Sequence, residues 1–281
     1  MTLAGPAMDE AGATAARHAL TDAEARAWRE DGFFLRPACF DGDELAALRD
    51  AAETAARTAA ARVRDHGRTY FLDGKRFVDA GHVTVQFEHA PGSETIRVIE
   101  PVAELEPRLD ALLDDLRLTE PVRGLLGTRD LALWTDKLNL KRAGEGSGFG
   151  WHQDAPYWTH ACAHPDRLPN VYVALDAADA ANGCLRGIRG SHRAGALAGT
   201  DDGTQLGGFY TDPALVDPAG EVRLEVPAGS LVFFDPWLVH GSGPNVSAAA
   251  RRALVVTYQP GGHPTLKAGR VRPVPDPVPA R

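Results

Sequence analysis

Apolar residues recur with a helical period in the first half of the chain and with a strand-like period in the second half. The alanine-rich segment from 41 to 67 places Leu45, Leu48 and Ala52 on one stripe at helical spacing. Such a stripe covers a single neighbouring surface, so the pattern predicts a long amphipathic helix that packs on one side.

Shorter elements are predicted on both sides of this helix. Thr21, with Glu24 three residues later, forms a capping box, and Gly32 supplies the stop of a first helix. The segment FFLRPACF that follows is predicted to be a short strand. YFLDGKRFVDAG and HVTVQFEHAPG suggest a hairpin, and roughly residues 103–126 form another helical region.

Beyond residue 126 the helical period disappears. Short segments alternate or run apolar between glycine, proline and asparagine, which is typical of strands. These segments are LALWTDKLNLK, NVYVALDAAD, EVRLEVPAG, SLVFFDPWLVHGSG and RRALVVTYQP. They predict a mainly β fold of two packed sheets with helices on its outside. Residues 66–95 and 195–220 are long, glycine-bearing and poorly patterned, so we expect them to form lids over a pocket.

The length of 281 residues fits one large domain, which we place at residues 18–262. The N-terminal part of this domain is predicted to be mainly helical and the C-terminal part to be rich in strands. By composition, residues 1–17 are expected to be a disordered extension, and residues 263–281 a loosely held proline-rich tail.

Charge and cysteine content narrow the classes of partner and compartment. The formal net charge is -8 and acidic residues are spread along the chain, which argues against nucleic acid or an anionic membrane as a partner. We therefore expect a small-molecule partner. No apolar run approaches the ~20 residues that span a bilayer, and no basic start precedes an apolar block. Cys39, Cys162 and Cys184 are odd in number and far apart, so a disulfide framework is not indicated and we expect a cytoplasmic protein.

The candidate chemistry begins in GWHQDAPYW, residues 150–158. In an extended segment, side chains two residues apart share a face, so His152 and Asp154 point the same way. A mononuclear iron site that activates oxygen needs two histidines and one carboxylate on one face of the metal. His240 supplies a second histidine at the end of the apolar run SLVFFDPWLVH. Taken alone, the H-x-D pair also fits a surface pair or a carboxylate that orients a buried histidine.

A candidate anion clamp follows His240. Ser242 shares the face of this histidine, and the chain then reverses through GPN and returns as RRALVVTYQP. This reversal is expected to place Arg251 and Arg252 at the head of the neighbouring antiparallel strand, with one of them facing inward. An inward arginine beside a metal offers a bidentate fork for a carboxylate.

Together these residues resemble the phytanoyl-CoA dioxygenase family. The resemblance rests on H-x-D at 152–154, on His240 with Ser242 after it, and on Arg251, eleven places after that histidine. It extends to NGCLRGIRGSH and to TDAEARAWREDGFFL, and it covers roughly residues 20–260. The chain departs from the family at two positions: Arg189 stands where proline usually precedes GSH, and Tyr172 stands where several members have tryptophan.

The resemblance implies a double-stranded β-helix, or jelly-roll, core and a non-haem Fe(II) and 2-oxoglutarate-dependent dioxygenase that consumes O2. Carried over by position, it makes His152, Asp154 and His240 the iron ligands. It also implies that Arg251 and Ser242 clamp the distal carboxylate of 2-oxoglutarate. Family halogenases replace the carboxylate ligand by a small residue, so the intact aspartate points to hydroxylation.

The resemblance also gives weaker candidates. Lys137 and Tyr172 are candidates for the cosubstrate pocket. Tyr157 and Trp158 either line the substrate mouth or belong to the core. The segment THACAH, residues 159–164, offers alternating histidine and cysteine, but three ligands within five residues of one strand cannot easily surround a tetrahedral zinc ion.

Several functions stay open at this level. The leading prediction is hydroxylation of a C–H bond in a modest-sized metabolite, such as an amino-acid derivative or a natural-product intermediate. The same metal site also supports desaturation, epimerisation or cyclisation in natural-product biosynthesis. A non-catalytic jelly-roll binding module is the third alternative, against which the intact ligands and clamp argue.

Overall fold

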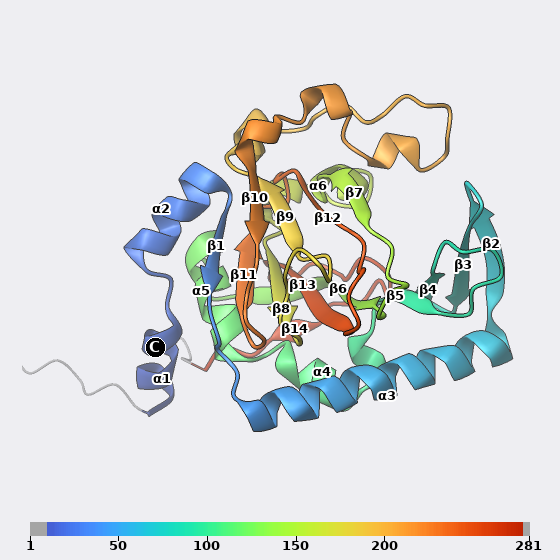
Figure 1. The fold of residues 1–281 in the computed structure, drawn as a ribbon. Helices are drawn as coiled ribbons and strands as arrows, with labels where there is room; N and C mark the ends of the chain where they lie inside the picture. The colour runs from blue at the N-terminus through green and yellow to red at the C-terminus, as the bar shows by residue number, and fades with distance from the viewer. Residues whose placement is uncertain (1–9, 278–281) are drawn as a thin grey trace, which may run out of the picture.

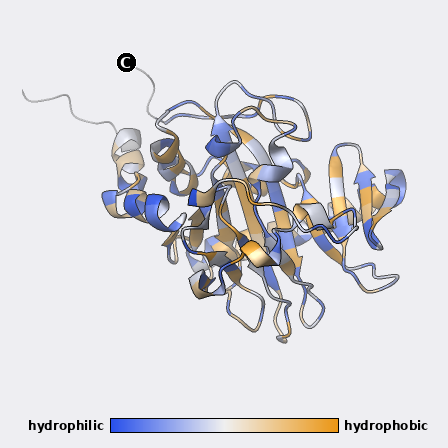
Figure 2. Cartoon of the chain, turned by 90° about the horizontal axis from the view of Figure 1, so that it is seen from above, coloured by the Kyte–Doolittle hydropathy of each residue, from blue (hydrophilic) through white to orange (hydrophobic). Residues whose placement is uncertain are grey.

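A computed structural model describes residues 10–277 of the protein (Figure 1). Within this range the chain forms a ten-stranded and a four-stranded antiparallel sheet with helices around them, which confirms the predicted mainly β, jelly-roll class. Figure 2 shows the apolar residues concentrated on the central strands. No helix of the described range is both long and apolar enough to cross a bilayer.

The large sheet carries most of the core. In spatial order its strands are β1 (Phe33–Arg36), β11 (Leu231–Phe234), β8 (Asn170–Ala174), β13 (Arg251–Pro260), β6 (Leu131–Lys141), β5 (Ile96–Glu100), β4 (Val83–Phe87), β3 (Lys75–Ala80) and β2 (Arg68–Leu72), with β14 (Pro273–Val274) also paired to β6. The small sheet runs in the order β10 (Glu221–Leu224), β9 (Leu185–Ile188), β12 (His240–Ser242) and β7 (Phe149–His152).

The helices begin and end where the capping residues predict. Thr21 and Glu24 form the capping box of α2 (Asp22–Asp31), and Gly32 ends this helix in the left-handed region at φ 85°. An equivalent box, formed by Asp41 and Glu44, starts α3 (Gly42–His66). The remaining helices are α1 (Glu10–His18), α4 (Pro107–Leu112), α5 (Leu116–Leu126) and α6 (Ala155–Trp158), with 3-10 turns η1 (Ala103–Leu105), η2 (Pro165–Arg167), η3 (Ser191–Ala194), η4 (Gly207–Phe209), η5 (Pro213–Leu215) and η6 (Pro218–Gly220).

The helical region predicted at 103–126 is three pieces, η1, α4 and α5. Glu106 and Asp115 each accept a hydrogen bond from a backbone N–H two residues later, so each caps a new helix start and breaks the run. The long helix α3 packs its apolar stripe on the large sheet, as expected (Figure 1). Ala51, Ala55 and Ala59 are fully buried there, because small side chains let helix and sheet approach closely.

Both ends of the predicted domain differ from expectation. Residues 10–18 form α1 rather than disordered chain, while residues 1–9 lie outside the described range. The tail, expected to be loosely held, pairs with β6 through β14 and buries Val274. Arg272 adds ion pairs to Asp110 and Asp114. Sheet pairing and partly exposed ion pairs hold this segment, which composition alone does not indicate.

Residues 66–95 contain the predicted hairpin, because β3 and β4 pair as antiparallel strands, and they add a third strand, β2. They form strands β2, β3 and β4, which extend the large sheet beyond β5. The second predicted lid, residues 195–220, is a loop with three 3-10 turns that arches over the open end of the sheets (Figure 1). Asp73 at the β2–β3 turn accepts hydrogen bonds from the backbone N–H groups of Gln205 (3.0 Å) and Leu206 (2.6 Å), so the two segments meet.

The reversal after His240 crosses from one sheet to the other. The sequence suggested that the returning arginine strand neighbours the histidine strand, but β12 lies in the small sheet, whereas β13 pairs with β6 and β8 in the large one. Ser242 and Arg251 therefore lie on different sheets and line a common cavity between them.

Candidate active site

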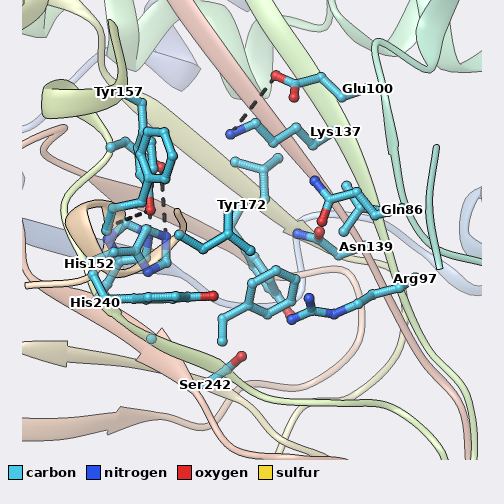
Figure 3. Close-up of a pocket in the computed structure, with 18 of the residues that line it drawn as sticks. Gln86, Arg97, Glu100, Lys137, Asn139, His152, Tyr157, Tyr172, His240 and Ser242 are labelled. Atoms are coloured by element: carbon cyan, nitrogen blue, oxygen red, sulfur yellow. Dashed lines mark hydrogen bonds and ion pairs between the residues drawn. The ribbon is translucent and has the colours of Figure 1, made fainter. Parts of the chain in front are cut away.

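Two histidines face each other across neighbouring strands of the small sheet. His240 on β12 is the register partner of His152 on β7, and their ring centroids are 4.1 Å apart. Asp154 follows β7 at the start of α6, where its backbone N–H donates to the Pro236 carbonyl (3.0 Å). The ligand atoms of the three side chains lie within 4.8 Å of one another, and all three side chains line one cavity. Figure 3 shows His152 and His240 side by side at its wall.

The hydrogen bonds of both rings fix which nitrogen is free. His152 Nδ1 donates to the Gly150 carbonyl (2.8 Å) and His240 Nδ1 donates to the Leu238 carbonyl (2.9 Å), because a carbonyl can only accept. Each Nε2 therefore keeps its lone pair. These Nε2 atoms lie 3.8 Å and 3.7 Å from the two carboxylate oxygens of Asp154. Histidines that bind a metal through one ring nitrogen usually donate a hydrogen bond from the other one. The Nδ1 contacts of His152 and His240 to backbone carbonyls match this pattern.

Charge and hydrogen bonding at the site suit a divalent cation. Burial and the neighbouring His240 lower the pKa of His152 to about 3, which keeps its ring neutral. Burial raises the pKa of Asp154, but His240 and Lys137 offset this effect and hold that pKa below its ordinary value. Two neutral imidazoles and one carboxylate are the donor set of non-haem Fe(II) sites, so the residues present fit this ion.

A polar chain behind the carboxylate was not predicted. Asn170, the first residue of β8, donates to Asp154 Oδ2 at 3.0 Å, and Thr257 on β13 donates to Asn170 Oδ1 at 2.6 Å. All three side chains are buried. The signal in the sequence was a lone asparagine at the head of an apolar strand, which does not by itself indicate a function.

A second cluster of polar side chains lines the cavity around Arg251 and Ser242. This residue is 3 % exposed; its guanidinium donates to the Gly183 carbonyl (2.8 Å) and to the Tyr172 hydroxyl (3.3 Å), and its Nε has no partner within the described chain. Ser242 accepts a hydrogen bond from Lys141 at 2.8 Å. Burial, with Arg251 and Arg97 close by, lowers the pKa of Lys141 to about 6.

The adjacent Arg252 faces the other way. It forms an ion pair with Asp176 at 2.8 Å and a second with Glu53 at 3.2 Å. Strand alternation therefore turns Arg251 into the cavity and Arg252 out of it, which is the parity that the family resemblance implied.

Gly183 explains why an Asn-Gly turn precedes β9. Its φ is +78°, and a Cβ there would meet the Gly243 carbonyl and Lys141 Nζ. Lys141 donates to the Gly183 carbonyl at 3.3 Å and also to the Gly243 carbonyl. The turn thus presents a bare backbone to two buried basic side chains, Lys141 and Arg251. Lys141 was missed by the sequence analysis, although it alternates with Lys137 and Asn139 along one face of β6.

The cavity between the clusters has a volume of about 470 Å³. His152, Asp154, His240, Ser242, Arg251, Lys137, Tyr172, Tyr157 and Trp158 all line it, so the structure brings every candidate residue together. Tyr157 stacks on Phe209 of the lid loop and donates to its carbonyl at 2.7 Å. Trp158 is 2 % exposed and packs edge-on against Trp134, so it belongs to both the core and the wall.

The alternative zinc site does not form. Among residues 10–277, the His152, Asp154 and His240 set is the one group of acids, histidines and cysteines placed to hold a metal ion. His164 instead lies against His263, with ring centroids 4.2 Å apart and ring planes tilted by 45°, and its Nε2 lies 3.3 Å from the Gln259 side-chain oxygen. A jelly roll with a histidine, histidine and carboxylate face open to a cavity defines the class of mononuclear iron oxygenases.

Comparison with known proteins identifies the family. The family model described as phytanoyl-CoA dioxygenase (PhyH) matches residues 28–253, so the chain belongs to this family. It is 28 % identical over 253 residues to the ectoine dioxygenase of Bordetella parapertussis, covering 85 % of this chain and 75 % of that protein. It is also 34 % identical over 140 residues to the L-proline trans-4-hydroxylase of Streptomyces griseoviridis, covering 43 % of this chain and 52 % of that one.

A solved structure supports the same conclusion. The crystal structure of EctD from S. alaskensis with 2-oxoglutarate and 5-hydroxyectoine matches with a TM-score of 0.67 and 25 % identity, covering 92 % of this chain and 79 % of the other. Family, fold and donor set agree. The protein is a non-haem iron dioxygenase of the 2-oxoglutarate-dependent class, and the predicted class is confirmed.

Proposed function

We propose that His152, Asp154 and His240 bind Fe(II), and that Arg251 with Ser242 binds the distal carboxylate of 2-oxoglutarate. The observation that carries this assignment is the Arg251 guanidinium, which is buried and has no ion-pair partner within the described chain. A buried charge without a counter-charge costs several kcal/mol. A carboxylate bound there supplies the missing charge and accepts from the unpartnered Nε.

The bound metal supplies activation of O2, coupled to decarboxylation of 2-oxoglutarate to succinate and CO2, for oxidation of a C–H bond. The chain's own residues provide placement. Arg251 and Tyr172 set the depth at which the cosubstrate lies, and Asn170 holds Asp154 in the orientation that ligation needs. Tyr157, stacked on Phe209, covers the metal wall and keeps bulk water away from it.

We propose hydroxylation of a small polar metabolite as the reaction. The relatives act on ectoine and L-proline, which are small molecules with a carboxylate and a ring nitrogen. A cavity of about 470 Å³ suits a molecule of that size beside the cosubstrate. Cys39, Cys162 and Cys184 are free thiols, which, like Fe(II), persist in a reducing compartment and support the cytoplasm as the place of action.

Product mass distinguishes this function from its alternatives. The protein is incubated with Fe(II), 2-oxoglutarate, O2 and a pool of small metabolites, and products and succinate are quantified together. Hydroxylation adds one oxygen atom, desaturation and oxidative cyclisation remove two hydrogens, and epimerisation leaves the mass unchanged. Product without matching succinate contradicts the cosubstrate assignment, and neither product nor succinate favours the binding module.

A further inference from the structure

Lys137 is a charged residue of the cavity whose ammonium group has no hydrogen-bond partner within residues 10–277. Its closest acid is Glu100, with Nζ and Oε1 4.0 Å apart, which is longer than a hydrogen bond. Figure 3 shows the two side chains together at the end of the cavity away from Ser242. Glu100 is already engaged, because Thr135 donates to its Oε1 at 2.8 Å.

The strand register separates Lys137 from the proposed cosubstrate clamp. Arg251 is paired with Lys141, whereas Lys137 is paired with Val255, four residues further along β6 and β13. At about 3.4 Å per residue this is a shift of roughly 13 Å along the strands. Lys137 instead lies within electrostatic reach of Glu100 and Asp154, on the metal's side of the cavity. The register therefore places Lys137 away from the proposed clamp for the distal carboxylate.

Packing holds the ammonium group of Lys137 at the cavity surface. Nζ lies 5.4 Å from the centroid of the Trp158 ring, within the range of a cation–π contact. The fixed ring and the Glu100 carboxylate limit where the ammonium can move. It remains a hydrogen-bond donor that the protein itself does not use.

Two carboxamide side chains without hydrogen-bond partners lie on the same wall of the cavity as Lys137. Gln86 on β4 and Asn139 on β6 line the cavity near Lys137 (Figure 3), and neither side chain has a hydrogen-bond partner within the described chain. The lining as a whole contains five lysine and arginine side chains against two carboxylates. Because Fe(II) with a 2-oxoglutarate dianion adds no net charge, this excess of positive charge remains after both are bound.

We propose that Lys137 is a specificity-determining residue that binds an anionic group of the substrate, a carboxylate or another small oxyanion. This inference rests on the proposed function, since it assigns the substrate to the space between Lys137 and the metal wall. Gln86 and Asn139 complete the recognition by hydrogen bonding to polar atoms of the same molecule. The target C–H bond then lies between the anchored anion and the ligand face of His152 and His240.

The experiment uses the anaerobic protein loaded with Fe(II) and 2-oxoglutarate. L-proline with L-prolinamide, and acetate and methylphosphonate with acetamide, are titrated as matched probes with and without an oxyanion group. Perturbation of the visible Fe(II)–2-oxoglutarate absorption is followed. We expect the acids to bind and the amides to bind at least tenfold more weakly. Loss of one charge-assisted contact in Lys137→Met weakens acid binding by about 10- to 100-fold, and Lys137→Arg restores part of it.

Lys267→Met is the matched control, because Lys267 lines the same cavity but already donates to Thr84 at 3.1 Å. Retention of the absorption in Lys137→Met shows that the iron and cosubstrate site is intact, so a change in acid binding belongs to Lys137. Amides that bind as tightly as acids, wild-type protein that binds no acid, or a Lys137→Met variant that still prefers acids would each overturn the inference. Loss of the absorption in the wild type would instead refute the proposed function.

Discussion

The cavity wall that carries the metal ligands and the wall around Lys137 differ in how completely the protein satisfies its own polar groups. Along the first wall, the histidine Nδ1 atoms bond to backbone carbonyls, and Asp154 is held by Asn170. Along the second wall, Lys137 and two carboxamides lack a hydrogen-bond partner in the described chain. The metal ligands are thus preorganised by protein contacts, whereas the wall around Lys137 keeps its donors and acceptors for a ligand.

The largest expected effect comes from removing one of the metal ligands. His240→Ala should abolish Fe(II) binding and turnover, because two remaining ligands cannot complete the three-residue face. Equilibrium dialysis with Fe(II) and a succinate assay measure both. His160→Ala, at the same cavity but outside the triad, should keep its iron. Wild-type activity in His240→Ala would contradict the ligand assignment.

The next effect concerns the buried guanidinium of Arg251. Arg251→Gln should raise the KM for 2-oxoglutarate by about 10- to 100-fold, because a hydrogen bond between charged groups contributes roughly 1.5–3 kcal/mol. Arg252→Gln is a neighbouring control, since Arg252 pairs with Asp176 outside the cavity. Steady-state kinetics at saturating iron give both values. Equal KM values in the two variants would place the carboxylate elsewhere.

A smaller effect is expected from the polar chain behind the carboxylate. Asn170→Ala removes the donor to Asp154 and should weaken iron affinity by about 10-fold, at the lower end of the range for groups that orient metal ligands. Thr257→Val, one contact further away, should weaken it less. Competitive chelator titrations rank the two variants. Unchanged affinity in Asn170→Ala would show that Asp154 needs no orientation.

The last and most local prediction concerns Asp136, on the back face of β6, and its effect on the stability of the fold. Burial raises the pKa of Asp136 to about 6, although the Val102 and Ala103 N–H groups donate to it. A raised folded-state pKa means that its contribution to stability is present below about pH 4 and is lost as the pH rises to about 6. Asp136→Asn should therefore gain up to ~3 kcal/mol relative to wild type between these pH values.

Urea unfolding of wild type and Asp136→Asn at several pH values measures this difference. The exposed Asp201→Asn is the control and should show a difference that does not change with pH. Parallel pH curves for wild type and Asp136→Asn would mean that the buried carboxyl titrates at its ordinary pKa.

Local signals in the sequence were sufficient for the helix caps and the ligand histidine pair. Thr21, Glu24 and Gly32 act within one or two turns of chain, so their pattern determines the element directly. The crossing of β13 to the other sheet was not predictable, because strand pairing depends on contacts between residues far apart in sequence. For the same reason the tail's pairing with β6 was missed.

The candidate site also combines residues that a local sequence pattern identifies with residues whose roles depend on distant contacts. The H-x-D spacing, His240 and the arginine offset form a pattern that identifies the metal ligands. Lys141 and Asn170 carry no pattern of their own, and their roles depend on partners distant along the chain, Ser242 and Asp154. Lys137 was noticed as a candidate for the cosubstrate pocket, but its distance along the strands from Arg251 depends on the register of β6 against β13, which the sequence does not reveal.

The most direct test of the account is an anaerobic titration of metal-free protein with Fe(II) and then 2-oxoglutarate, followed by visible absorption. The account predicts a charge-transfer band from the chelated keto acid in wild type and Arg252→Gln. In Arg251→Gln the band should appear only at much higher 2-oxoglutarate. Folded, iron-loaded wild type without a band, or a band at the same 2-oxoglutarate concentration in all three proteins, would contradict it.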